Sequence, residues 1–348
     1  MLAAVFKGEG KLVLEDRPKP EIKSNTDVLI KVRAVGVCGT DLHILQIPPA
    51  HPAKRNSILG HEFTGEIVEV GSAISDFRAS ELVLIDPHPG CGVCAPCKRG
   101  EPDRCIPLFT AEAPGHCATI GIFSDGAMTS YVVVPRQSLY KVSPRVPAHI
   151  AALAEPLSCV INAFDKLNMR PGESVVVLGA GPIGLLFISL FRAAGASRLI
   201  VSEPAEYRRQ AAVDCGATTV VDPTREDLVA VVQQELNGEG PNIVVEAVGP
   251  LLPLAIELVG GHGRVLQFGH DETVQPAIPV GTMLKKEVVI YGAFIGRHSF
   301  ERTATVMESG ILPLERIVSH RLPLKRVQEG IDLLRKGQAI KVIIEPQE

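Results

Sequence analysis

The chain has 348 residues, more than a single hydrophobic core of ordinary size accommodates, and this length indicates two domains. Hydrophobic residues make up 46% of the chain and charged residues 21%, a balance that predicts a globular protein with a large core. The formal net charge is −4 and the basic residues are dispersed, which argues against nucleic-acid binding and against attachment to an anionic membrane.

The start of the chain lacks the pattern of a secretory signal. Its apolar residues at positions 1–6 give way to polar sequence, whereas a signal peptide needs an apolar stretch of about 7–15 residues. We therefore expect a cytoplasmic protein, whose eight cysteines serve as metal ligands or free thiols. The longest apolar run, residues 175–191, is broken by glycines and a proline, so a short soluble motif explains it better than a membrane helix.

Residues 2–150 show the pattern of short strands. Alternating or apolar runs at 28–32, 65–70 and 131–134 are separated by glycine, proline and aspartate. This pattern predicts a closed or partly closed antiparallel barrel, with loops at the strand ends where side chains can converge.

Two of these loops hold the residue types of a catalytic zinc site. Cys38 is followed about twenty residues later by His61 and Glu62, and such an ion usually takes three ligands of these kinds with one position left open. Beside the thiol, the Thr40 hydroxyl and the His43 ring could pass a proton from a bound alcohol to solvent. The alternative is a buried cysteine and a core histidine.

Four of the eight cysteines fall close together in the same part of the chain. Cys91, Cys94, Cys97 and Cys105 are separated by two, two and seven residues, and this spacing can close a four-thiolate zinc site of the structural kind. Free thiols in a loop are one alternative. An iron–sulfur cluster uses other spacings, and a zinc ribbon that binds nucleic acid would need a basic face.

Residues 157–284 alternate apolar strands with helical stretches, which predicts a doubly wound parallel sheet covered on both faces. Its first strand, 174–178, leads into a Gly-x-Gly-x-x-Gly turn and a helix at 185–194, the context of a dinucleotide-binding fingerprint. The first glycine permits the turn, the second admits a pyrophosphate to the helix N-terminus, and the third lets helix and strand pack closely. The predicted cofactor turn comprises Gly179, Gly181, Pro182, Ile183 and Gly184.

The next strand, 199–202, ends at Glu203, about twenty residues after the turn, where an acid accepts hydrogen bonds from the adenine ribose. This residue predicts NAD as cofactor, because a carboxylate would repel the 2′-phosphate of NADP. Arg208 and Arg209 lie about a turn into the next helix and are the counter-indication. We interpret them as ribose contacts or surface charge.

Later strands at 219–222, 243–249 and 264–269 fit the same sheet. The last two end in glycine, which suits loops that pass close to a nicotinamide ring, with Val248 and Phe268 as the predicted contacts. The tail ends in a strand at 340–344, which we expect to return to the first domain. The predicted domains are 1–156, with the cysteine lobe at 91–105, then the NAD-binding domain 157–287, then the returning segment 288–348.

With these motifs in order along the chain, the sequence resembles the zinc-containing medium-chain alcohol dehydrogenases, in the branch of polyol (sorbitol-type) and threonine dehydrogenases. The resemblance covers essentially the whole chain. It implies an α/β protein in which a β-rich, partly closed barrel of the GroES-like kind carries catalysis and a Rossmann domain binds NAD. It also implies two zinc ions per chain and a homotetramer.

The resemblance also implies roles for single residues. Glu155 takes the place of the third zinc ligand beside Cys38 and His61, either directly or through water, and Glu62 lies next to the ion and exchanges onto it in some members. Glu62 and Glu155 are therefore also candidates for proton transfer. Lys341 matches a basic residue near Glu62 and the cofactor phosphates. A further residue, Asp41, either orients the histidine ligand or caps a loop.

Three departures from the family pattern concern substrate contacts. Sorbitol-type enzymes carry a tyrosine where this chain has Ile44, and an arginine in the segment matching 293–297, where only Arg297 offers itself. The segment between His43 and Gly60 also lacks the tryptophan of typical threonine dehydrogenases.

The expected activity is NAD-linked, zinc-dependent oxidation of a secondary hydroxyl to a ketone in a small polyol, sugar alcohol or hydroxy amino acid. A dehydrogenase of simple secondary alcohols is the first alternative. A non-enzymatic protein that binds the cofactor is the second. A zinc-free quinone reductase would lack Cys38, His61 and the four clustered cysteines, all of which are present.

Overall fold

The structure is a computed structural model that describes residues 1–109, 116–271 and 273–347. The chain forms two compact units. The first comprises Met1–Ser158, Gly296–Ser309 and Val318–Glu348, and the second comprises Cys159–Ile295 and Gly310–Ile317. Among the described residues, no helix is long and apolar enough to cross a membrane.

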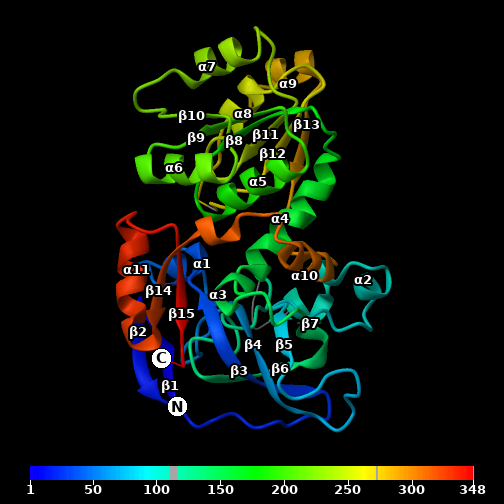
Figure 1. Ribbon diagram of the computed structural model, residues 1–348, viewed down its shortest axis with the longest axis vertical. Helices are drawn as coiled ribbons and strands as arrows, with labels where there is room; N and C mark the ends of the chain where they lie inside the picture. The colour runs from blue at the N-terminus through cyan, green and yellow to red at the C-terminus, as the bar shows by residue number, and fades with distance from the viewer. Residues whose placement is uncertain (110–115, 272, 348) are drawn as a thin grey trace. The chain divides into compact units, whose positions relative to one another are not determined.

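The first unit contains a two-stranded hairpin and a seven-stranded sheet (Figure 1). The sheet has the order β14-β15-β3-β4-β5-β7, and β6 pairs with β3. All of these pairings are antiparallel except that of β14 with β15. The hairpin strands are β1 (Leu2–Gly8) and β2 (Lys11–Asp16), and the sheet strands are β3 (Asp27–Gly36), β4 (Glu62–Val70), β5 (Leu82–Ile85), β6 (Tyr131–Pro135), β7 (Leu139–Lys141), β14 (Val318–Pro323) and β15 (Lys341–Glu345).

Strand β3 lies at the centre of this unit, because it pairs with β4, β6 and β15. Its apolar side chains Val28, Ile30 and Val32 are fully buried in one hydrophobic cluster with residues of the other strands. Helices occupy the connections and the returning tail. They are α1 (Gly39–Ile44), α2 (Ala95–Lys98), α3 (Ala148–Ala151), α10 (Phe300–Ser309) and α11 (Val327–Arg335), while α4 (Ala154–Leu167) runs from this unit into the second.

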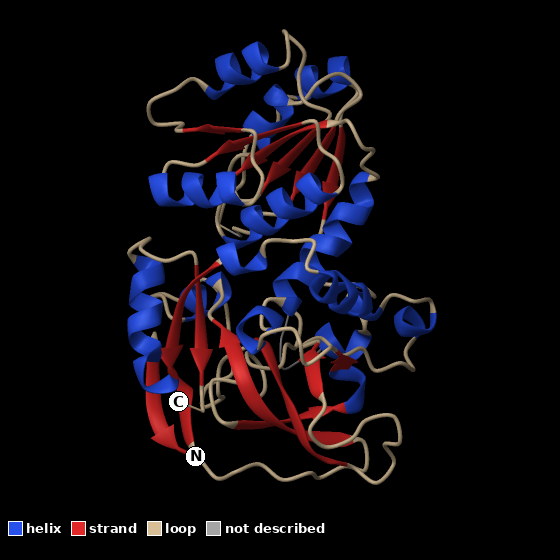
Figure 2. Cartoon of the chain, viewed as in Figure 1, coloured by secondary structure: helices blue, strands red, loops and turns tan. Residues whose placement is uncertain are grey.

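The second unit contains a six-stranded sheet of order β10-β9-β8-β11-β12-β13, in which every pairing is parallel. The order reverses between β8 and β11, so this is the doubly wound arrangement with its switch point at that pair. Helices cover both faces, α5 and α6 on one and α7, α8 and α9 on the other (Figure 2). The strands are β8 (Ser174–Leu178), β9 (Arg198–Ser202), β10 (Thr219–Val221), β11 (Ile243–Glu246), β12 (Arg264–Gln267) and β13 (Val289–Gly292). The helices are α5 (Pro182–Ala193), α6 (Glu206–Asp214), α7 (Leu228–Glu235), α8 (Leu252–Leu258) and α9 (Val280–Lys286).

The structure assigns two segments of the tail differently from the sequence prediction. β13 pairs with β12 and completes the parallel sheet, and Gly310–Ile317 also belongs to the second unit, whereas the sequence placed 288–348 with the first. A strand of four residues has the same pattern in either sheet, so its partner is decided only by folding.

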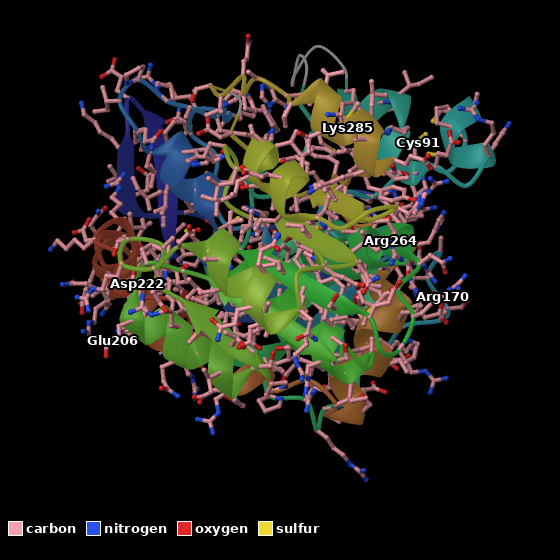
Figure 3. The ribbon with its side chains drawn as sticks, turned by 90° about the horizontal axis from the view of Figure 1, so that it is seen from above. Cys91, Arg170, Glu206, Asp222, Arg264 and Lys285 are labelled. Carbon is pink, nitrogen blue, oxygen red and sulfur yellow. The ribbon has the colours of Figure 1, made fainter. Side chains whose placement is uncertain are left out.

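Arg264 of β12, labelled in Figure 3, connects this sheet to the end of α4, because it forms an ion pair with Glu173 and donates a hydrogen bond to the Leu167 carbonyl.

The turn between β8 and α5 shows why its glycines differ in importance. Gly179 has φ +95°, a conformation that favours glycine, and a Cβ on Gly184 would meet the Gly179 carbonyl oxygen. Gly181 is the N-cap of α5 with φ −68° and ψ −176°, and nothing lies within 4 Å of the position of its Cβ. The space beside Gly181 is therefore open, while Gly184 serves packing.

Gly184→Ala should lower the free energy of unfolding of the second unit by about 1–3 kcal/mol, because the added methyl group meets backbone that cannot yield cheaply. Gly181→Ala is the matched control and should change stability by less than about 1 kcal/mol. Urea unfolding followed by circular dichroism measures both, since the chain has no tryptophan. Equal stability of the two variants would contradict this packing role.

Candidate active site

Cys38 lies where strand β3 gives way to helix α1. It is the N-cap of α1, with extended backbone at φ −97° and ψ 158°. The fully buried Asp41 accepts a hydrogen bond from the Cys38 backbone N–H at 2.9 Å, which caps the helix and fixes the residue that carries the thiol. The Thr40 hydroxyl lies 3.7 Å from Cys38 Sγ. His43, half-buried, lies one turn further along the same helix.

His61 and Glu62 enter at the start of β4. The preceding Gly60 has φ +100°, and its Cβ would lie 2.9 Å from Met128 Cγ, so glycine is required for the chain to turn here. His61 is only 4% exposed, and its Nδ1 lies 3.9 Å from Asp41 Oδ1. Neither atom has a hydrogen-bond partner among the described residues. A small ring rotation would join them and leave Nε2 as a metal ligand, so Asp41 can serve both predicted roles.

The three side chains lie close enough together to bind a zinc ion after small movements. The ligand atoms of Cys38, His61 and Glu62 lie within 4.8 Å of one another. Zinc bonds of about 2.0–2.3 Å place tetrahedral ligand atoms about 3.4–3.8 Å apart, so small side-chain movements would close the site. The mixed sulfur, nitrogen and oxygen set also suits this ion. The residues present therefore fit a zinc ion.

The charges around the thiol favour a cation as well. Burial and then the Glu62 carboxylate raise the pKa of Cys38 well above its usual range, with Asp41 and Glu155 acting in the same direction. Burial likewise raises the pKa of Asp41. A divalent cation would reverse these effects by supplying positive charge to a buried acidic cluster.

The positive charge of Lys341 lowers the pKa of that thiol, and Lys341 forms a buried ion pair with Glu62. Both side chains are almost inaccessible, at 3% and 2% exposure. They meet beside Gly36, where a Cβ would strike the Glu62 carboxylate and lie 2.9 Å from Lys341 Cε. Burial lowers the pKa of the ammonium, but Glu62 and Cys38 outweigh it and raise that pKa above the ordinary value. The structure thus brings Lys341 to Glu62, and contact with the cofactor phosphates stays a prediction.

Glu155 lies in the first turn of α4, buried at 8% exposure. Its charge acts on the pKa of both Cys38 and Lys341, so it faces the same cluster. Among the described residues it does not join the group of three whose ligand atoms lie within 4.8 Å of one another. A zinc bond to Glu155, direct or through water, stays a prediction.

The four clustered cysteines form the second candidate metal site, marked by Cys91 in Figure 3. The sulfur atoms of Cys91, Cys94, Cys97 and Cys105 lie within 4.8 Å of one another, and none is in a disulfide. Backbone N–H groups of Cys91 and Cys94 donate to the sulfurs of Cys105 and Cys91 at 3.2 and 3.4 Å. A hydrogen bond from the backbone at Cys97 lowers the pKa of Cys94 to about 6, whereas burial raises that of Cys105 to about 12. Four thiols with backbone support fit structural zinc.

Arg297, which the sequence offered as a substrate contact, instead supports this lobe. Its guanidinium donates to the Gly100 carbonyl at 3.1 and 3.2 Å and lies 3.5 Å from Asp103. His298 also contacts the Gly100 carbonyl, at 3.0 Å. The tail segment that begins α10 is thereby fastened to the four-cysteine loop. This contact could not be predicted from the sequence, because the partners are almost 200 residues apart.

In the second unit, Glu203 lies directly beside the glycine-rich turn. It is 4% exposed, and its carboxylate accepts hydrogen bonds from Ala180 N at 2.9 Å and Ala205 N at 3.0 Å. Each carboxylate oxygen retains a lone pair for a ribose hydroxyl. Arg209 is engaged with the Glu203 carbonyl at 2.8 Å and with Asp222 at 3.2 Å, and Arg208 donates to the Tyr207 hydroxyl.

The two predicted nicotinamide contacts lie at the ends of β11 and β12. Val248 is 49% exposed, and its Cγ2 lies 2.8 Å from the position of a Cβ on Gly179. Phe268 packs edge to face on Phe187 at 5.2 Å between ring centroids. Beneath these loops lies a buried glutamate, Glu246, bonded to several backbone N–H groups. Its role was not predicted from the sequence, where the one indication was a charged residue inside an otherwise apolar strand.

Comparison with known proteins agrees with this geometry. The family "Alcohol dehydrogenase GroES-like domain" matches residues 24–144, and "Zinc-binding dehydrogenase" matches residues 182–309. An L-threonine 3-dehydrogenase of Pyrococcus horikoshii is 35% identical over 343 residues, which cover 96% of this chain and 94% of that protein. The chain belongs to the zinc-containing medium-chain alcohol dehydrogenases.

Two further relatives show the breadth of this dehydrogenase family. A sorbitol dehydrogenase of Bombyx mori is 31% identical over 354 residues, covering 99% of this chain and 98% of the relative. The crystal structure of a protein described as a zinc-binding dehydrogenase from Sinorhizobium meliloti 1021, bound to NADP, superposes with a TM-score of 0.89 at 29% identity and covers 99% of both chains. The predicted family, two-part α/β fold and enzyme class are confirmed.

Replacing Lys341 with methionine should destabilise this dehydrogenase by about 3–5 kcal/mol, because the Glu62 carboxylate would remain buried without its partner. The double variant Glu62→Gln with Lys341→Met should recover most of that loss, since two neutral side chains of similar size replace the pair. Urea unfolding of both variants without added metal measures the difference. A double variant as unstable as the single one would show that the ion pair is not the cause.

Cys94→Ala should reduce bound zinc from two ions per chain to one, because each of the two ligand groups is proposed to bind its own ion. Cys215→Ala is the matched control, since this buried thiol belongs to neither group. Metal analysis by mass spectrometry measures the ratio. A count that Cys94→Ala leaves unchanged would remove the four-cysteine site.

Proposed function

We propose that this dehydrogenase oxidises a secondary hydroxyl of a small polyol, sugar alcohol or hydroxy amino acid to a ketone, with NAD as the hydride acceptor. One observation carries the proposal, namely the convergence of Cys38, His61 and Glu62 within 4.8 Å. The relatives named as threonine and sorbitol dehydrogenases support the substrate class. A simple secondary-alcohol dehydrogenase remains the alternative that the substrate test decides.

The residues of the first unit divide the work of the reaction. We assign Cys38 and His61 to holding zinc, with Glu62 or Glu155 completing the set, directly or through water. When bound, zinc supplies a Lewis acid for the substrate oxygen and NAD supplies the hydride acceptor. The hydroxyl of Thr40, 3.7 Å from Cys38 Sγ, accepts the substrate proton in this proposal.

His43 then receives that proton on its way to solvent. Its ring lies one turn beyond Thr40 on α1 and is half-buried, so it connects the interior of the site with water. Asp41 fixes the start of this helix through the Cys38 N–H, which keeps thiol, hydroxyl and ring in register. Lys341 pairs with the Glu62 carboxylate and thereby restricts the rotation of that side chain.

For the cofactor, we assign the open backbone at Gly181 and the helix start at Pro182 and Ile183 to the pyrophosphate. Glu203 is assigned to the adenine ribose. Its carboxylate favours NAD, and Arg209, which could otherwise attract a 2′-phosphate, is already engaged with Asp222 and backbone carbonyls. We assign Arg208, which lies on α6, to a contact with the ribose.

We also propose the cytoplasm as the location and a homotetramer as the assembly. Among the described residues no cysteine forms a disulfide, and four gather as a metal-ligand set, which suits a reducing compartment. The tetramer follows the family resemblance, and sedimentation of the purified protein tests it.

A substrate panel decides between the polyol and simple-alcohol readings. With NAD present, kcat/KM for 2,3-butanediol, sorbitol or threonine should exceed that for 2-butanol, because polar groups of the pocket are left unpaired by an alcohol with one hydroxyl. The increase in absorbance of the reduced nicotinamide measures each rate. A preference for 2-butanol would contradict the polyol assignment, and the role of Glu155 would then be limited to the zinc ion, without a contact to the substrate.

Glu203→Gln should narrow the preference for NAD over NADP by about tenfold or more, because the amide no longer repels a 2′-phosphate. Glutamine keeps one acceptor oxygen, so one of the two backbone N–H groups that donate to Glu203 retains its partner. The ratio of kcat/KM for the two cofactors measures the change. Equal efficiency of the unaltered enzyme with both cofactors would overturn the NAD assignment.

A further inference from the structure

A buried polar bracket joins the ends of β11 and β12. Glu246, the last residue of β11, is fully buried, yet its Oε1 accepts hydrogen bonds from Val248 N at 3.0 Å, Gly249 N at 2.7 Å and Leu251 N at 3.4 Å. Its Oε2 accepts one from Gln267 Nε2 at 2.7 Å. One carboxylate therefore binds three backbone N–H groups of the loop after β11 and also a side chain at the end of the neighbouring strand β12.

Gln267 extends the bracket to the second loop. Its Nε2 lies 2.7 Å from Glu246 Oε2, 3.2 Å from the Gly249 carbonyl and 2.8 Å from the Gly269 carbonyl. All three atoms are acceptors, so only the amide nitrogen can face them, and the orientation of the side chain is fixed. Its Oε1 is left buried without a partner among the described residues. A buried unpaired oxygen is unfavourable for stability, so this glutamine obtains its three Nε2 contacts at a cost that a residue without that oxygen would not incur.

The two loops that the bracket joins pack backbone to backbone. A Cβ on Gly269 would strike Gly249 N and lie 2.6 Å from both Glu246 Oε2 and Val248 C. Gly249 has φ +131°, which no other residue type adopts readily. The position of one loop therefore determines the position of the other.

The bracket lies at the switch point of the sheet. β11 is the strand next to β8, on the other side from β9, as Figure 1 shows. In a doubly wound sheet the adenosine half of a dinucleotide is held by the first three strands, and the other half by the strands beyond the switch. Val248 in the held loop lies against Gly179 of the glycine-rich turn and is half exposed, so it presents an apolar surface there.

We propose that Glu246 and Gln267 are positioning residues that set the two loops against the nicotinamide half of the cofactor. Neither side chain contacts the cofactor, and both act through Val248 and the Gly249–Gly269 contact. This inference rests on the proposed NAD-dependent function. It predicts that losing the bracket weakens binding of the whole dinucleotide and leaves binding of its adenosine diphosphate half unchanged.

Calorimetry with the full chain tests the inference with two ligands, NAD and ADP. Glu246→Gln retains Oε1 for the three N–H groups but turns an N–H₂ towards Gln267, and Gln267→Met removes the amide at similar volume. Each variant should weaken NAD binding by about tenfold or more, the usual effect of losing hydrogen bonds to a charged group, and change ADP binding by less than about twofold. Glu226→Gln, an exposed residue after β10, is the control and should change neither.

The outcomes separate the inference from the function on which it rests. If both variants bind NAD as tightly as the unaltered enzyme, or lose NAD and ADP binding in parallel, the bracket has no positioning role. If the unaltered chain binds neither ligand, the proposed function fails and the inference fails with it. Should Gln267→Met not fold, Glu246→Gln decides the question, because it keeps the contacts that hold the first loop.

Discussion

Buried negative charge is the constraint on which the site of the first unit depends. Asp41, Glu62 and Glu155 are all buried around the Cys38 thiol. Burying an ionised group is unfavourable unless the group forms an ion pair or hydrogen bonds, and the structure shows such a partner for Asp41 and for Glu62. The Cys38 backbone N–H donates a hydrogen bond to Asp41, and Lys341 forms an ion pair with Glu62. The negative charge that remains favours a divalent cation at this place. Such a cation would in turn allow several buried acids to lie close together.

The strand order makes that compensation possible. β15 and β4 flank β3, so Lys341 at the start of β15 and Glu62 at the start of β4 meet across Gly36. The absence of a side chain at Gly36 leaves room for the pair. In the second unit, Gly269 and Gly184 likewise remove a Cβ where two backbone segments approach closely. Both units thus place polar groups at strand ends and use glycine to bring neighbouring segments within bonding distance.

Locally encoded features could be predicted from the sequence. The four cysteines lie within one loop, so their spacing alone limits them to one metal site, and the sulfur atoms do converge. The glycine-rich turn and Glu203 also follow from adjacent segments, because a strand, a turn and a helix of the right lengths leave few arrangements. Cys38 and His61 were harder, since Cys38 follows β3 and His61 precedes β4, and their pairing relied on knowing which residue types bind zinc.

The sequence by itself determined the order of the elements, the four-cysteine group and the dinucleotide-binding turn, because each depends on residues near one another or on a periodic pattern. Only the tertiary structure decided that Arg297 supports the cysteine lobe and that β13 joins the parallel sheet. It alone also showed that Glu246 and Gln267 share a buried bracket. These contacts form between side chains brought together by strand pairing, and a single charged residue in an apolar strand has the same local pattern whether or not it finds a partner there.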